Sequence, residues 1–89
     1  MLRINAAAEE GEEIVLEVEG WVAGAGVELL RREGAPYLRT GYRLVLDLEG
    51  VRFLDPKGLA LLEEWSGEQL ELRGGSPFIR MLLRIHGLI

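Results

Sequence analysis

The chain has 89 residues, a formal net charge of −5 and no cysteine. That length gives one domain with a single modest core, and 48% hydrophobic with 28% charged residues is typical of a soluble globular protein. The lack of cysteine excludes disulfides and thiolate metal sites, and no Asp or Glu follows the only histidine, His86, at ligand spacing. We therefore expect no metal and no cofactor.

The charge is unevenly placed along the chain. Residues 1–20 hold six glutamates and one arginine, so they account for the whole net charge. No basic stretch could attract a phosphate backbone broadly, which argues against nucleic-acid binding. No apolar run approaches the ~20 residues of a membrane-spanning helix, and the N-terminus lacks the apolar core of a signal peptide. We expect a cytoplasmic protein.

The first half of the chain predicts two strands, a helix and a third strand. A short edge strand is expected at 2–4, a polar connector at 6–13, and a half-buried strand at 14–22, where apolar and polar residues alternate. A helix follows from Val27 to the Thr40–Gly41 stop, and Pro36 should kink or split it. The nearly continuous apolar run at 43–48 is typical of a parallel strand covered on both faces.

The second half predicts a helix at 58–65, a short strand at 69–73 and a last helix after Ser76. Ser76 suits an N-cap, Pro77 the first helical position and Gly87 a C-terminal cap. The last helix has two apolar rows: Phe78, Met81, Leu82 and Ile85 form the amphipathic face, and Ile79 and Leu83 form a second row. We expect part of the second row to stay exposed and to support a homodimer or an obligate partner.

The resulting order, β-β-α-β-α-β-α, predicts a single α/β domain over residues 1–89. Its sheet should be mixed but mostly parallel, with flanking helices. Binding sites in such sheets lie beyond the carboxyl ends of the strands. The loops GWVAGAG (20–26) and EGVRFLDPKG (49–58) are expected there. The first lacks the spacing of a nucleotide-binding loop, so it is interpreted as a strand-to-helix turn.

The joint DPKG at 55–58 combines a helix start with the only lysine of the chain. Asp55 can cap the helix by accepting a backbone N–H from Lys57 or Gly58, and Pro56 suits the first helical position. A cation in the first turn opposes the helix dipole, so Lys57 adds no stability. Lys57 is then either a tolerated surface residue or a partner contact. Trp21 is either core or a partner anchor, and Trp65 is expected in the core.

Three segments resemble the STAS domain family, typified by anti-sigma-factor antagonists. They are LEVEGWVAGAGVELL (16–30), RLVLDLEGVRFLDPKGLALL (43–62) and LELRGGSPFIRMLLRIHGL (70–88). In phosphorylated members the loop after the third strand is DSSG or DSTG, and its second hydroxyl residue accepts phosphate from a kinase that is also the anti-sigma factor. Here Pro56 and Lys57 replace both hydroxyl residues, so the resemblance implies no phosphoacceptor. The family carries the motif Gly-x-x-Asp in the segment that corresponds to residues 20–23, and Ala23 stands here in place of its acid.

The resemblance implies a non-catalytic protein–protein interaction module, like an anti-sigma-factor antagonist but without phosphorylation control. An alternative is a small accessory subunit of an ABC-type phospholipid transporter, because single STAS domains of that kind resemble the GLALL segment. Both use the same face, so the sequence does not separate them. An enzyme or small-ligand binder is less favoured, since no nucleophile–base pair is expected at this edge. The expected partner-binding residues are Trp21, Ala23, Asp55, Pro56, Lys57, Gly58 and Leu59.

Overall fold

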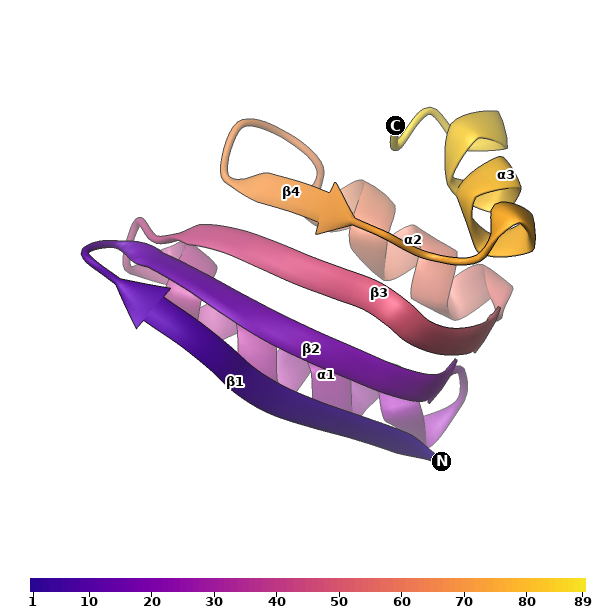
Figure 1. The fold of residues 1–89 in the computed structure, drawn as a ribbon, viewed down its shortest axis with the longest axis horizontal. Coiled ribbons are helices and arrows are strands. Elements are labelled where there is room, and N and C mark those ends of the chain that lie inside the picture. Colours follow the sequence, from indigo (N-terminus) through magenta and orange to yellow (C-terminus); the bar gives the residue numbers. More distant parts are fainter.

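Four strands form one mixed sheet, shown for residues 1–89 in the computed structural model of Figure 1. The order along the chain is β-β-α-β-α-β-α, which confirms the prediction. The strands are β1 (Leu2–Glu10), β2 (Glu13–Val22), β3 (Arg43–Leu54) and β4 (Leu70–Arg73). The helices are α1 (Ala25–Arg39), α2 (Pro56–Trp65) and α3 (Pro77–Ile85). No helix is long and apolar enough to cross a membrane.

The strands lie in the spatial order β1-β2-β3-β4. β1 pairs antiparallel with β2, whereas β2, β3 and β4 are parallel. The predicted mixed, mostly parallel sheet is confirmed. Because parallel strands end at the same side of a sheet, the turns that follow β2 and β3 meet there. We call this region, residues 21–26 and 53–58, the carboxyl edge.

The N-terminal hairpin is longer than the sequence predicts. Residues 6–13 were expected to form a polar connector, but β1 continues to Glu10 and β2 begins at Glu13. Only Gly11 and Glu12 form the turn, and Gly11 adopts φ 61°, which favours glycine. Alanine and glutamate are poor strand formers. The pairing with β2 outweighs this local preference and makes the prediction of a connector wrong.

One face of the sheet carries the core. Seventeen buried side chains form a single cluster. β2 contributes four even-numbered residues, which share one face of the strand: Ile14, Leu16, Val18 and Val22. α1 and α2 lie behind the sheet in Figure 1, on that one face. The strand at 43–48 is therefore covered by helices on one face only, although Val45 on its other face is also buried. Val45 is the one buried hydrophobic residue outside the cluster.

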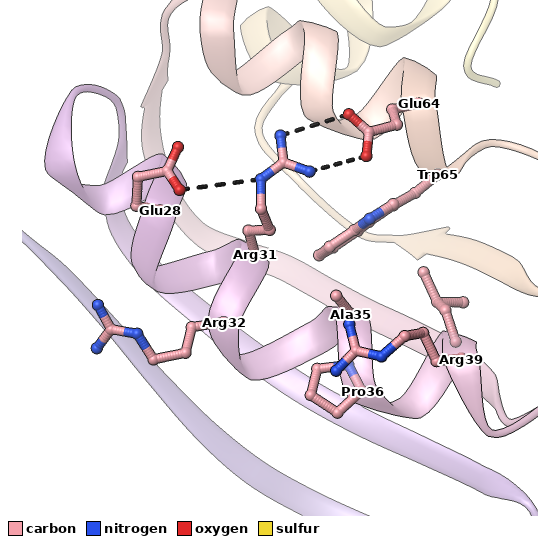
Figure 2. Close-up of a pocket in the computed structure, with 9 residues that line it drawn as sticks. Glu28, Arg31, Arg32, Ala35, Pro36, Arg39, Glu64 and Trp65 are labelled. Atoms are coloured by element: carbon pink, nitrogen blue, oxygen red, sulfur yellow. Dashed lines mark hydrogen bonds and ion pairs between the residues drawn. The ribbon is translucent and has the colours of Figure 1, made fainter.

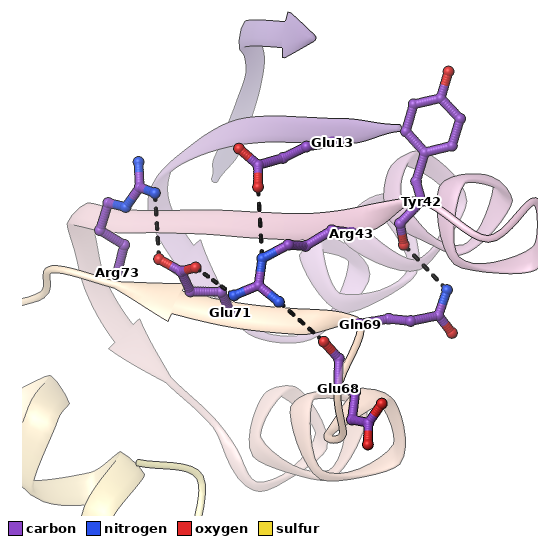
Figure 3. A network of polar contacts seen from close by, with 7 residues as sticks. All are labelled: Glu13, Tyr42, Arg43, Glu68, Gln69, Glu71 and Arg73. Atoms are coloured by element: carbon purple, nitrogen blue, oxygen red, sulfur yellow. Dashed lines mark hydrogen bonds and ion pairs between the residues drawn. The ribbon is translucent and has the colours of Figure 1, made fainter. Parts of the chain in front are cut away.

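The opposite face carries a polar network instead of helices (Figure 3). Arg43 on β3 contacts Glu13 on β2 at 3.5 Å and Glu71 on β4 at 2.6 Å, and Arg73 contacts Glu71 at 3.2 Å. By strand alternation and register, Val45 lies on this face between Arg43 and Glu71. Long charged side chains can cover apolar surface with their methylene groups. This explains how Val45 is buried without a helix above it.

α1 is a single helix despite Pro36. The predicted split does not occur, because Pro36 lies in the last turn and interrupts only the end of the hydrogen-bond ladder. The Thr40 hydroxyl donates to the carbonyl oxygens of Pro36 and Tyr37 at 3.0 and 3.1 Å. On the core side, buried Gly34 contacts the ring of Trp65, which is itself buried as predicted. α1 and α2 therefore pack closely.

α3 has the predicted ends, but it buries the other of its two apolar rows. The Ser76 hydroxyl accepts the Ile79 N–H at 3.2 Å, and Leu88 N–H donates to Leu83 oxygen at 2.8 Å across Gly87. This confirms the N-cap and the glycine C-cap. The buried row, however, is Ile79 and Leu83. Most of the row that was expected to face the core is exposed, as described below.

Candidate functional site

The carboxyl edge is held together by the carboxylate of Asp55. Asp55 is the N-cap of α2, and its Oδ1 accepts the Gly58 N–H at 2.7 Å. Its Oδ2 accepts the Gly24 N–H at 3.0 Å, and its own N–H donates to the Val22 oxygen at 3.2 Å. The predicted cap is confirmed. The second contact, which the sequence did not indicate, ties the turn before α1 to the turn before α2.

Gly58 allows the two turns to approach each other. A Cβ at position 58 would lie far inside van der Waals contact with the Val22 carbonyl oxygen, and 3.0 Å from the Val22 side chain. The φ angle of Gly58 is not in the left-handed region, so conformational freedom is not the reason for glycine here. The requirement is steric. A small residue at position 58 fixes where α2 begins relative to β2.

The electrostatics of this edge favour an ionised Asp55. The Gly58 N–H, followed by the Gly24 N–H, lowers the pKa of Asp55 below its ordinary value of 3.8, and the nearby Lys57 lowers it further. Asp55 accepts both backbone hydrogen bonds in its charged form. Lys57 is exposed and forms no ion pair. A cation is thus available to another molecule at the start of α2.

Two aromatic side chains of the carboxyl edge lie on the sheet face opposite α1 and α2, because Trp21 and Phe53 alternate with the buried Val22 and Leu54. Trp21 of β2 is paired in register with Phe53 of β3, and their ring centroids lie 6.1 Å apart in an edge-to-face arrangement. Their exposed fractions are 55% and 44%. Trp21 is therefore not a core residue. Phe53 belongs to this surface too, although the sequence placed it within an apolar run and gave no sign that it is exposed.

Comparison with known proteins assigns the family. The family described as "Mlab, STAS domain" matches residues 5–88. This chain is a STAS domain. The solved structure of the anti-sigma factor antagonist SpoIIAA in its unphosphorylated form has a similar fold, with a TM-score of 0.71 and 20% sequence identity. The likeness covers 93% of this chain and 83% of that chain. No curated protein sequence matches.

The residues expected to bind a partner separate into two groups in this STAS domain. Trp21, Pro56 and Lys57 are exposed, and Ala23 and Asp55 are half-buried at the same edge. The other two are buried. Gly58 packs against β2, and Leu59 is 6% exposed within the core cluster. Gly58 and Leu59 are therefore part of the packing beneath the carboxyl edge, and the first group, with Phe53, is accessible there.

The serine and threonine residues of the STAS domain are not among the residues of the carboxyl edge, and their hydroxyls contact helix ends. Thr40 contacts the C-terminal turn of α1. Ser66 donates to the Glu63 oxygen at 2.8 Å at the end of α2, and Ser76 caps α3. Residues 51–65 contain no Ser, Thr or Tyr. No group of three His, Asp or Glu side chains that could hold a metal ion occurs.

The largest hollow, an open groove of about 640 Å³, lies between α1 and α2 (Figure 2). Arg31 crosses it and contacts Glu64 at 2.8 and 3.4 Å and Glu28 at 3.9 Å. The hydrogen bonds that Arg31 donates to the Glu64 carboxylate raise the pKa of Arg31. Trp65 forms the floor, where it packs on α1. Because an ion pair already spans the groove, we interpret it as a helix–helix contact rather than a ligand site.

Proposed function

We propose that this STAS domain is a non-catalytic protein-interaction module that binds its partner through the carboxyl edge, without phosphorylation control. The observation that carries the proposal is the position of Lys57. It stands, exposed and unpaired, at the first turn of α2, where phosphorylated relatives carry the acceptor hydroxyl. A phosphoserine would bring about −1.5 to −2 charges to this point. Lysine brings one positive charge, so this edge has the opposite electrostatics.

The neighbouring aromatic pair supports the same surface. Exposed Trp and Phe side chains are costly to leave in water, and tryptophan is enriched among the residues that dominate binding energy at protein interfaces. Strand pairing holds the backbones of Trp21 and Phe53, and their rings contact each other edge to face, so they lose little conformational freedom when a partner covers them. Asp55 keeps the turn beside them rigid through Gly24 and Gly58. The partner should present an apolar contact for the aromatic pair and an acidic group for Lys57.

The leading partner is an anti-sigma factor of the kinase-like class, which makes the protein a cytoplasmic regulator of transcription. To test this, the purified domain is titrated with such a protein by calorimetry, and incubated with it and ATP before intact-mass measurement. We expect binding, a loss of affinity in Trp21→Ser, and no added phosphate. Arg39→Glu, on an exposed residue at the end of α1, is the control and should bind normally. Phosphate mapped to residues 51–65 would contradict the proposal.

A second candidate is an accessory subunit that binds the ATPase of an ABC-type phospholipid transporter. The resemblance of the GLALL segment (58–62) to single STAS domains of such transporters supports it. The same titration with such an ATPase distinguishes the two candidates. Binding to the ATPase alone, with the same sensitivity to Trp21→Ser, would assign the second function. If substitution of Trp21 and of Lys57 leaves the affinity for either partner unchanged, the interface lies away from the carboxyl edge.

A further inference from the structure

α3 exposes an apolar row that nothing in this chain covers. Phe78, Met81 and Ile85 are 52%, 47% and 70% exposed, and they recur at i, i+3 and i+7. The opposite side of the helix, with Ile79 and Leu83, is buried in the core. α3 is thus apolar on two sides, and only one is used by the fold. Figure 1 shows α3 beyond β4, at one end of the molecule.

The charged side chains of α3 itself, Arg80 and Arg84, are both basic. No Asp or Glu occurs after Glu71, whereas Arg73, Arg80 and Arg84 do. Arg84 is exposed and forms no ion pair. The acids of other elements that approach the α3 region are already engaged. Glu63 of α2 contacts the His86 Nδ1 at 3.1 Å, and Glu49 of β3 accepts the Gly75 N–H at 3.1 Å.

A second copy of the chain is a poor occupant for this row. The other exposed large hydrophobic residues are Met1, Trp21, Phe53 and Ile89, and none of them lies on α1 or α2. A symmetric dimer through this row would therefore pack α3 against α3. It would place the arginines of one copy near those of the other, and like charges at an interface oppose association. The homodimer expected from the sequence is not favoured by this surface.

We propose that the exposed row of α3 docks an amphipathic helix of a partner protein whose apolar stripe is bordered by acidic residues. The i, i+3, i+7 spacing matches the narrow seam at which two helices pack. The unpaired Arg84 complements Glu or Asp at the rim of that seam. None of its residues belongs to the carboxyl edge as defined above. The inference does not depend on which partner the carboxyl edge binds.

The test uses a synthetic helical peptide that repeats leucine at i, i+3 and i+7 and borders it with glutamate. Its control has lysine in place of glutamate. Both are titrated into the isotope-labelled chain and followed by amide chemical shifts. We expect the glutamate peptide to shift amides of residues 77–86, to bind at least tenfold more tightly than the lysine peptide, and to weaken as salt rises. Ile85→Asp should reduce this binding about tenfold and Arg84→Glu about threefold, and Arg39→Glu should leave it unchanged.

Three results would overturn the inference. The first is that the two peptides bind alike, or that neither shifts the amides of α3. The second is co-sedimentation of the chain with vesicles of phosphatidylcholine and phosphatidylglycerol that Ile85→Asp abolishes, which would make α3 a membrane contact. The third is a dimer in light scattering that Ile85→Asp converts to a monomer. Matched thermal melts check that each variant is folded, which we expect because Ile85 and Arg84 are exposed.

Discussion

Asp55 accepts a hydrogen bond from the backbone N–H of Gly24, 31 residues earlier in the chain, at 3.0 Å. The same carboxylate caps α2 through Gly58. One side chain therefore fixes two helix starts, and with them the surface between them. A cap that serves a single helix could be replaced by any small polar residue. Here a carboxylate uses both oxygens, one for each turn.

Asp55→Ala should lower the melting temperature by roughly 4–8 °C, the shift expected when a domain of this size loses one helix N-cap. Asp55→Asn should lower it less, because the amide oxygen can still accept one of the two hydrogen bonds. Thermal melts of the three proteins at neutral pH measure this. If alanine and asparagine have the same effect, the cap is not the source of the stabilisation.

The pH dependence of stability follows from two lowered carboxyl pKa values. The Gly58 and Gly24 N–H groups lower the pKa of Asp55 from 3.8, and the hydrogen bond from Arg43, then that from Arg73, lowers the pKa of Glu71 from 4.5. A group whose pKa is lower in the folded state stabilises fully above its unfolded pKa, and that contribution is lost as pH falls through the folded pKa. Stability should therefore be flat above pH 4.5 for these two groups and should fall below it.

The measurement is a series of denaturant unfolding curves from neutral pH down to the acid range. Glu71→Gln and Asp55→Asn should each flatten the acid side of the profile, because each removes one titrating group. Their combination should flatten it further, since the two residues lie in different networks and their effects should add. Profiles that run parallel to that of the wild type would show that neither carboxylate has a lowered pKa.

The ends of α3 could be predicted from the sequence because caps are local. Ser76, Pro77 and Gly87 act through contacts within a few residues of themselves. The side of α3 that is buried could not be predicted in the same way. Both apolar rows have helical spacing, and only the position of α3 relative to β3 decides that Ile79 and Leu83 face the core. The same holds for Phe53, whose exposure depends on which face of the sheet the helices cover.

Gly58→Ala should destabilise the protein by about 1–3 kcal/mol, the usual cost of overpacking. Helix propensity alone predicts the opposite sign, because alanine is favoured over glycine inside a helix by about 1 kcal/mol. The added methyl group must displace the Val22 carbonyl, which is backbone and cannot rotate away. Denaturant unfolding measures the change.

Ala60→Gly, on an exposed residue of the same helix, is the matched control. It should cost about 1 kcal/mol through propensity alone. Both variants should then be destabilised, although one replaces glycine with alanine and the other replaces alanine with glycine in the same helix. A stabilising Gly58→Ala would mean that β2 and α2 can separate without cost, and that the steric role of Gly58 is absent.

Lys57→Glu separates a binding role from a structural one by the signs of two effects. Glutamate in the first turn of α2 interacts favourably with the helix dipole, whereas lysine opposes it. The loss of the attraction between Lys57 and the Asp55 carboxylate offsets part of this gain, so the variant should be more stable by under ~1 kcal/mol. If Lys57 contacts an acidic group of the partner, the same variant should bind more weakly. The loss should be under ~1 kcal/mol at a wet rim and a few kcal/mol if the contact is desolvated.

Unfolding curves and calorimetric titration with the partner measure the two quantities on the same preparation. Lys57→Ala is the intermediate variant. It should be neutral or slightly stabilising, and its affinity for the partner should lie between those of the wild type and Lys57→Glu. Greater stability together with lower affinity is the expected pair, because no gain in folding can explain a loss in binding. Greater stability with unchanged affinity at low salt would leave Lys57 as a tolerated surface residue. The aromatic pair, Trp21 and Phe53, would then be the centre of the interface without it.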